Sequence, residues 1–222
     1  KAGAGELFGG VIDPIWQNKY GKYIEFNRRG SYGKQGNCQS YQEIGEIIQI
    51  ADDYGVEFDL TINALQMWEE QIPYVRSILE KYKKVGGRNV IVSDLSIIPI
   101  AREYDFNVII SSCANVYNTY IAQYLKLEGC SKIIFPRDIS VQEMRNISET
   151  VPDMQYEMFM MNSGCRFQDG NCLGVHNTRF KELCSFCGKE GWDYHRLDGM
   201  ELSSEEKQSA FIVSEQYRRL LK

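Results

Sequence analysis

Four cysteines near the end of the chain are the residues best suited to metal chemistry. Cys165, Cys172, Cys184 and Cys187 lie within 23 residues, with the spacing C-x6-C-x11-C-x2-C. Thiolates bind soft metals, and a segment this short does not fold around a core of its own. The spacing therefore predicts a metal site within a cysteine-rich segment at residues 161–191.

Zinc and an iron–sulfur cluster both suit four thiolates. Structural zinc sites favour two short C-x2–4-C pairs, and of the two pairs only Cys184 and Cys187 have that form. Iron–sulfur clusters are held by four cysteines with more varied spacing. The spacing by itself is consistent with both zinc and an iron–sulfur cluster.

Two other cysteines, Cys113 and Cys130, adjoin apolar strands and are expected to pack in the core.

A second group of polar residues stands where the predicted strands end. In an α/β barrel, the catalytic residues lie at the carboxyl ends of the strands. The same residue types also cap helices and form turns, so each position has an ordinary structural alternative. Four apolar runs end in such residues: Asn63, Asp94, Ser111 and Ser112, and Arg137 and Asp138. We expect a ligand pocket lined by Asn63, Asp94, Ser112, Asn118 and Arg137.

Short apolar runs alternate with helical patterns along the chain, which predicts an α/β fold with a parallel sheet. Several runs are almost continuously hydrophobic, as in strands covered on both faces. A closed (β/α) barrel, complete or incomplete, and an open doubly wound sheet both agree with this pattern. The strands are expected at residues 7–12, 22–26, 58–62, 89–94, 107–112, 132–137 and 156–160, with a further candidate at 192–197, and helices at 41–54, 66–85 and 140–149. Ser140 and Glu143 are expected to form a capping box at the start of the last of these helices.

Length and composition indicate a single domain over residues 1–222. The formal net charge of −5 argues against nucleic acid as a partner. No apolar run is long enough to cross a membrane and no signal peptide is recognisable, so we expect a cytoplasmic protein. Seven cysteines, an odd number, favour metal-ligating thiolates in a reducing compartment over a disulfide framework.

An ordered set of motifs over about residues 55–175 resembles the peptidase U32 family. The set contains a strand ending in Asn, a strand ending in Asp and Leu, a Ser-rich strand end leading to an Asn, an Arg-Asp pair, and the pattern E-x-F-x5-C-x6-C. In this chain these are Asn63; Asp94 and Leu95; Ser111, Ser112 and Asn118; Arg137 and Asp138; and Glu157, Phe159, Cys165 and Cys172.

The resemblance implies a TIM-barrel-like fold and a 4Fe–4S cluster held by the four cysteines, with zinc as the alternative. Some members of the family draw a ligand from the amino-terminal half, which makes Cys38 a candidate substitute. Members with clear roles resemble oxygen-independent hydroxylases; some act on tRNA or ribosomal RNA and a partnered pair acts in ubiquinone synthesis. This chain has Met161 and Asn162 where the family often has His-Gly.

These observations predict redox or hydroxylation chemistry on a small molecule, with homo- or hetero-oligomerisation through a U32-like subunit as a further expectation. Asn63, Asp94 and Arg137 are the expected catalytic residues: Arg137 would hold an anionic group and Asp94 would move a proton or orient the ligand. Ser112, Asn118 and Asp138 would bind substrate. A hydrolase with a structural metal, or a non-catalytic subunit of a hetero-oligomer, are the alternatives.

Overall fold

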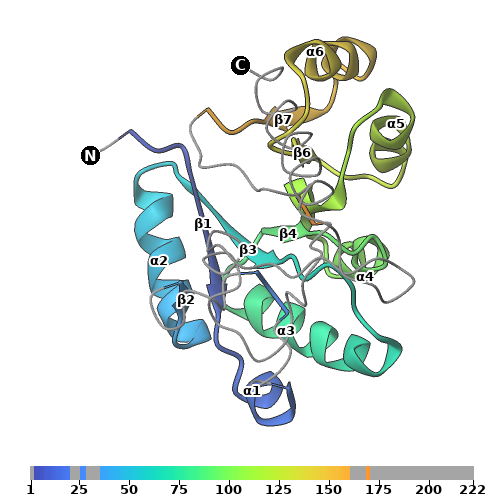
Figure 1. Cartoon of the computed structure of the whole chain (residues 1–222). Coiled ribbons are helices and arrows are strands. Elements are labelled where there is room, and N and C mark those ends of the chain that lie inside the picture. The colour runs from blue at the N-terminus through green and yellow to red at the C-terminus, as the bar shows by residue number, and fades with distance from the viewer. Residues whose placement is uncertain (1–2, 21–25, 29–35, 161–168, 171–222) are drawn as a thin grey trace, which may run out of the picture.

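The computed structural model describes residues 3–20, 26–28, 36–160 and 169–170. Their strands form one sheet in the order β2-β1-β3-β4-β5-β6-β7, and every neighbouring pair is parallel (Figure 1). This arrangement confirms the predicted parallel α/β fold. The strands are β1 (Glu6–Val11), β2 (Asn37–Cys38), β3 (Glu57–Ile62), β4 (Asn89–Val92), β5 (Asn107–Ile110), β6 (Lys132–Ile134) and β7 (Gln155–Glu157).

Helices connect the strands and begin where the sequence provides capping side chains. Ser140 and Glu143 form the predicted capping box at the start of α6, and Ser40 caps α2 by accepting a hydrogen bond from the backbone N–H of Glu43. Between β1 and β7, the described helices are α1 (Pro14–Tyr20), α2 (Tyr41–Asp53), α3 (Ile72–Lys84), α4 (Ile97–Glu103), α5 (Thr119–Leu127) and α6 (Val141–Thr150).

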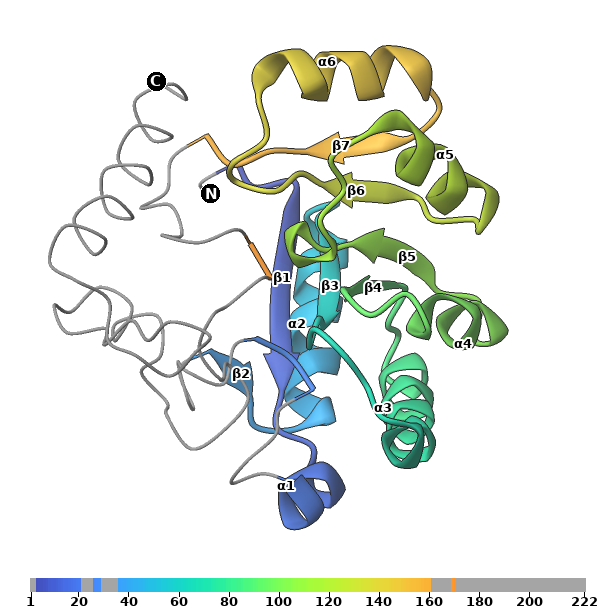
Figure 2. The same cartoon turned by 45° about the vertical axis from the view of Figure 1, so that its right-hand side comes forward.

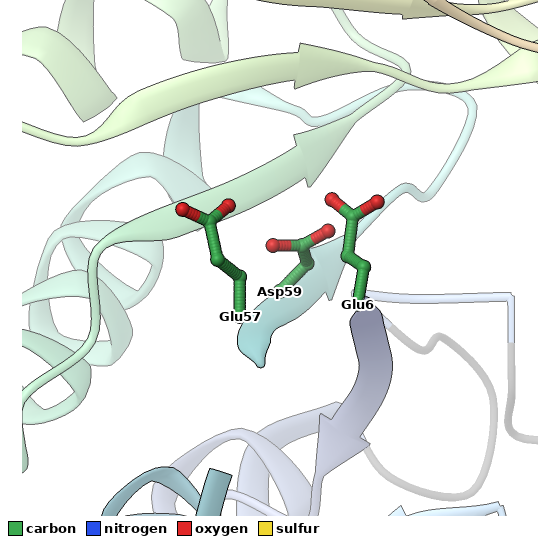
Figure 3. Close-up of side chains that lie close together, drawn as sticks. All are labelled: Glu6, Glu57 and Asp59. Carbon is green, nitrogen blue, oxygen red and sulfur yellow. The ribbon is translucent and has the colours of Figure 1, made fainter. Parts of the chain in front are cut away.

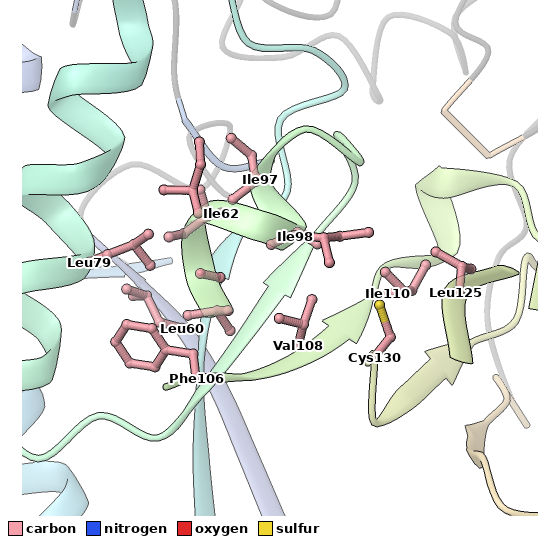
Figure 4. Packing of buried hydrophobic residues seen from close by; sticks show 14 of the residues in the cluster. Leu60, Ile62, Leu79, Ile97, Ile98, Phe106, Val108, Ile110, Leu125 and Cys130 are labelled. Atoms are coloured by element: carbon pink, nitrogen blue, oxygen red, sulfur yellow. The ribbon is translucent and has the colours of Figure 1, made fainter. Parts of the chain in front are cut away.

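The main hydrophobic core lies between the sheet and the helices (Figure 4). Leu60 and Ile62 of β3 and Ile110 of β5 are fully buried in this core. The alternate residues of the same strands belong to the opposite face of the sheet. There Ile91, Ile109 and Ile134 form a small apolar cluster, and charged residues occupy the amino ends of the strands. β3 therefore alternates between apolar and polar residues, whereas β4 is buried along its whole length, as predicted for the nearly continuous apolar runs.

The sheet is strongly curved, with its helices on the outside (Figure 2). Lys132 of β6 forms an ion pair with Glu6 of β1, although the two strands are four places apart in the sheet order. In a flat sheet strands four places apart would be separated by about 19 Å. The concave face must therefore bring β1 and β6 together. In the part of the chain that the structure describes, β2 and β7 are the two ends of the sheet, so closure into a barrel stays a prediction.

The predicted strand at 22–26 falls largely outside the described residues and the candidate at 192–197 wholly outside them, so both stay predictions. Elsewhere the local structure differs from the expectations, since the helices α1, α4 and α5 were not predicted. β2 was not predicted, because two strand residues inside a polar loop leave no periodic signal. The helix expected at 66–85 starts later, with α3 at Ile72, because Pro73 suits only the first turn of a helix. No helix among the described residues has the length and apolarity needed to cross a membrane.

Candidate active site at the carboxyl edge of the sheet

The predicted pocket residues follow four adjacent parallel strands. Because β3, β4, β5 and β6 are neighbours and parallel, their carboxyl ends lie along one edge of the sheet, called the carboxyl edge below (Figure 2). The structure therefore brings the predicted positions to the same edge. Asn63 follows β3, Asp94 follows β4, Ser112 follows β5, and Arg137 and Asp138 follow β6.

Asn63 and Asp94 bind backbone groups that shape this edge. The Asn63 Oδ1 atom accepts a hydrogen bond of 3.0 Å from the backbone N–H of Arg28. The two carboxylate oxygens of Asp94 accept from the backbone N–H groups of Met67, at 2.5 Å, and Ser96, at 2.9 Å. Both side chains are thus engaged in holding loops together, and their catalytic roles stay predictions.

The predicted substrate-binding residues have mixed surroundings. Ser112 is buried, and its hydroxyl oxygen lies 4.0 Å from the Cys113 sulfur. Asn118 is exposed and caps α5 by accepting a hydrogen bond of 3.1 Å from the backbone N–H of Ile121. Asp138 accepts a hydrogen bond from the Tyr117 hydroxyl. Of these three, Ser112 has the most enclosed environment.

Arg137 has a partner within its own chain, which sequence reasoning missed. Asp169 is only 4% exposed and accepts two hydrogen bonds from Arg137, one from its backbone N–H at 3.1 Å and one from Nη1 at 2.7 Å. The guanidinium lies over the Phe159 ring, 4.4 Å from the centroid. Arg137 was expected to hold an anionic group of a ligand. In this structure it binds the carboxylate of Asp169 instead.

Gly170 lies against the backbone of Cys113, in the short turn that follows β5. Its φ of +80° lies in the left-handed region, and a Cβ placed on it would be 2.5 Å from the Cys113 carbonyl oxygen. Only glycine suits this position without displacement of the backbone. Asp169 and Gly170 belong to the stretch between Cys165 and Cys172, so this part of the cysteine-rich segment contacts the carboxyl edge after β5 and β6. An Asp-Gly pair in the sequence signals a turn, but not its partner.

Two further residues at this edge were not predicted. Asn115 adopts a left-handed conformation with φ 59°, and its buried Oδ1 atom has no hydrogen-bond partner among the described residues. Asp13 follows β1 and is 2% exposed. Its carboxylate accepts from Lys81 Nζ at 2.7 Å, from the Tyr41 hydroxyl at 2.9 Å and from the Trp16 backbone N–H at 2.8 Å.

The electrostatics of Asp13 follow from these contacts. Burial by itself would raise the pKa of this carboxyl, but the hydrogen bonds from Lys81, Trp16 and Tyr41 outweigh it and lower the pKa below the ordinary value. Burial also raises the pKa of the Tyr41 hydroxyl, and the neighbouring Asp13 charge adds to that effect. Asp13 is therefore an ionised anchor that ties β1 to α2 and α3.

The predicted metal ligands Cys165, Cys172, Cys184 and Cys187 lie outside the described residues. The three cysteines that are described, Cys38, Cys113 and Cys130, form no disulfide with one another. Burial raises the pKa of the Cys113 and Cys130 thiols, the latter to about 12, so both stay protonated at neutral pH. Cys130 packs in the main core as predicted, whereas Cys113 is only partly buried and lies outside that core.

A curved, parallel α/β sheet with polar residues gathered at its carboxyl edge defines the structural class. The sequence model of peptidase family U32 matches residues 21–218, and the chain belongs to this family. The structure of the U32 peptidase Mk0906 is similar, with a TM-score of 0.50 and 18% sequence identity, covering 71% of this chain and 70% of that one. At this identity the structural similarity concerns the fold alone.

The relatives of this chain have names of two kinds, tRNA hydroxylation proteins and a collagenase. The chain is 30% identical to tRNA hydroxylation protein P1 of Bacillus subtilis, over 81% of this chain and 44% of the relative. It is 26% identical to tRNA hydroxylation protein P of Escherichia coli, over 69% and 35%. It is 24% identical to a collagenase of Porphyromonas gingivalis, over 78% and 45%. The chain spans less than half the length of each of these relatives.

Proposed function

We propose that this chain forms the barrel of an oxygen-independent hydroxylase that acts on a nucleoside of RNA and carries an iron–sulfur cluster. The observation that supports this most is the contact of Asp169 and Gly170 with the carboxyl edge. These two residues lie between Cys165 and Cys172, so the contact links the cysteine-rich segment to the edge that carries the predicted pocket. A metal held by these cysteines would then serve chemistry at that pocket.

Each group of residues has a separate role in this proposal. Cys165, Cys172, Cys184 and Cys187 would hold a 4Fe–4S cluster, which supplies one-electron transfer when bound. Ser112 and Asn115 offer a hydroxyl and a buried amide oxygen for orienting the base. Arg137 stabilises Asp169 with part of its guanidinium, and its side chain, 34% exposed, keeps donor capacity for an anionic group of the substrate.

RNA as the substrate revises the expectation of a small molecule. Relatives from four bacterial species are named tRNA hydroxylation proteins, and another is named a synthase of 5-hydroxycytidine in 23S rRNA. The net charge of −5 gives this chain little attraction for polyphosphate. We therefore expect most of the RNA-binding surface to come from sequence outside this chain or from a partner subunit, with this chain supplying the site for one base.

Peptide hydrolysis is the second candidate, because one relative is named a collagenase. A serine nucleophile needs a base within hydrogen-bond reach. The Ser112 hydroxyl lies 4.0 Å from the Cys113 thiol. Burial raises the pKa of that thiol, so it stays protonated at neutral pH and cannot act as the base. The described part of the edge therefore favours hydroxylation over hydrolysis.

Metal analysis after anaerobic purification tests the cofactor. We expect close to four iron and four sulfide per chain, on the ligation rule for such clusters. The Cys172→Ser variant should lose most of the iron, whereas Cys130→Ser, a matched change at a core cysteine, should retain it. Stoichiometric zinc without iron would overturn the iron–sulfur proposal and favour a structural metal.

Complementation tests the reaction and the substrate. The chain, expressed alone and fused to the remaining sequence of the Bacillus subtilis relative, is placed in a strain that lacks that relative. Mass spectrometry of tRNA nucleosides should show a gain of one oxygen atom with the fusion. No gain with the fusion, together with cleavage of collagen peptides by the purified chain, would instead establish the hydrolase.

A further inference from the structure

A cluster of charged side chains lies on the concave face, at the amino ends of the strands and opposite the carboxyl edge. Glu6 of β1 and Glu57 and Asp59 of β3 have carboxylate oxygens within 4.8 Å of one another (Figure 3). Asp59 is the most enclosed, at 2% exposed. Three carboxylates this close repel one another unless a proton or a cation intervenes.

Amide side chains on the adjacent strands bind one flank of the cluster. Asn89 of β4 donates from Nδ2 to Asp59 Oδ1 at 2.8 Å and to Glu57 Oε2 at 3.0 Å. Asn107 of β5 in turn donates to Asn89 Oδ1 at 2.9 Å. Asp59 thus has one oxygen satisfied by an amide donor, and its carboxylate also lies close to that of Glu6.

Lys132 of β6 binds the other flank through its ion pair with Glu6, and both side chains are largely screened from solvent. Glu6 and Asp59 have carboxylate oxygens within 4.8 Å of each other. An ionised carboxylate only accepts hydrogen bonds, so the two acids can bond to each other only when one of them carries a proton. Glu6 faces the ammonium of Lys132 and is the better place for the negative charge, which leaves the proton on Asp59.

The pKa values agree with this assignment. Burial raises the pKa of Asp59 to about 8, and the hydrogen bond and charge of Glu6 add to the rise. Burial would raise the pKa of Glu6 as well, but its bonds to Asp59 and Lys132 outweigh that and lower it. Four other ionisable groups among the described residues belong to the cluster or interact with it. Glu57 on β3 is part of it, and Arg88, just before β4, interacts with Glu57. Glu157 on β7 interacts with Glu6 and Lys132, and Tyr82 on α3 interacts with Asp59.

We propose that Glu6, Asp59 and Lys132 form a proton-dependent interlock that ties β1 to β6 across the concave face and loosens when the shared proton is lost. With the proton present, Glu6 accepts from both Asp59 and Lys132, and the net charge of the three groups is zero. Without it, two carboxylates stand within 4.8 Å of each other with the ammonium of Lys132 paired to one of them. The interlock is independent of the metal and of the hydroxylase proposal.

The sign of the pH effect follows from the raised pKa of Asp59. The folded protein keeps a proton up to about pH 8 that the unfolded chain releases near the ordinary value of 3.8. The stability linked to this group is therefore fully present below that ordinary value and is lost as the pH rises toward 8. Asn at this position reproduces the protonated acid, because its Nδ2 donates to Glu6 and its Oδ1 accepts from Asn89.

The test compares wild type with Asp59→Asn by chemical denaturation from pH 5 to pH 9. The ratio of their unfolding constants, wild type over variant, should rise by about tenfold per pH unit up to pH 8 and then level off. Asp153→Asn, an exposed control on the α6–β7 turn, should give a constant ratio. A constant ratio for Asp59→Asn would overturn the proposal.

Two measurements keep the test decisive if the variant does not fold. Carbon-13 NMR of the Asp59 carboxyl in wild type should titrate with a midpoint near pH 8, and a midpoint below pH 5 would overturn the shared proton. Hydrogen exchange, corrected for intrinsic rates, should show loss of amide protection at Leu7 and Ile133 between pH 7 and pH 9. Unchanged protection at both would overturn the loosening.

Discussion

At the scale of single residues, the carboxylates at the strand ends are held by groups of the same chain. Asp94 binds two backbone N–H groups, Asp13 binds Lys81 and Tyr41, and Asp169 binds Arg137. A buried charge needs such partners, because loss of hydration is otherwise uncompensated. The sequence shows which residues are charged, but the choice of partner depends on which strand ends lie next to one another.

The Arg137–Asp169 ion pair should contribute to stability. Arg137→Ala leaves the buried carboxylate of Asp169 with one backbone N–H donor, so we expect a loss of about 1.5–3 kcal/mol in the free energy of unfolding. Chemical denaturation of Arg137→Ala, of Asp169→Ala and of the double variant measures the coupling free energy between the two side chains. Arg145→Ala, an exposed change on α6, should cost less than about 0.5 kcal/mol. Additive effects of the two single changes would contradict a direct interaction.

Asp13 should make stability fall in acid. Because its pKa is lowered in the folded protein, its contribution is present above the ordinary value of 3.8 and is lost as the pH falls through the folded value. Asp13→Asn removes the attraction for Lys81 and should cost about 2 kcal/mol at pH 7, and the difference from wild type should shrink as the pH falls below the ordinary value of 3.8. Asp53→Asn, at the exposed end of α2, is the control for denaturation over the same pH range.

At the scale of elements, capping explains residues that also resemble binding residues. Asn118 and Ser140 both accept hydrogen bonds from backbone N–H groups in the first turn of a helix. Ser140 was predicted as a cap from its Glu three residues later, whereas Asn118 lacks that partner and was predicted to bind substrate. The capping box is a two-residue signal and a single Asn is not.

Two replacements of Asn118 separate its capping role from a substrate-binding role. Asp keeps the capping oxygen and adds charge at the amino end of α5, whereas Ala removes the cap. Asn118→Ala should lower the free energy of unfolding by about 1 kcal/mol, and Asn118→Asp should leave it unchanged or higher. If Asn118→Asp keeps its stability but loses hydroxylated nucleoside in the complementation assay, the binding role is supported.

At the scale of the whole molecule, curvature of the sheet places groups that are remote in sequence. Glu6 and Lys132 are 126 positions apart and meet across the concave face. Residues 169–170 return to strands β5 and β6 by contacts with Arg137 and Cys113. Each contact joins segments that no periodic pattern connects, so the sequence predicted the strands but not these pairs.

Metal content should distinguish the two ligand sets that the family resemblance allows. If Cys165, Cys172, Cys184 and Cys187 hold the metal, Cys38→Ser should retain it, because Cys38 packs partly against the core beside β1. Elemental analysis of anaerobically purified Cys38→Ser and Cys184→Ser proteins provides the comparison. Loss of metal in Cys38→Ser with retention in Cys184→Ser would make Cys38 a ligand.

The sequence alone determined the parallel α/β class, most strand positions, the family motifs and the polar residues at one edge, because these depend on local periodicity and on residues that end apolar runs. Tertiary structure decided which groups the buried charged residues contact. Arg137 binds Asp169, and Asp59 lies beside Glu6, because strand pairing and the curvature of the sheet set which buried groups are neighbours. The energy of a buried charge depends on its neighbours, so its role emerges only from the folded chain.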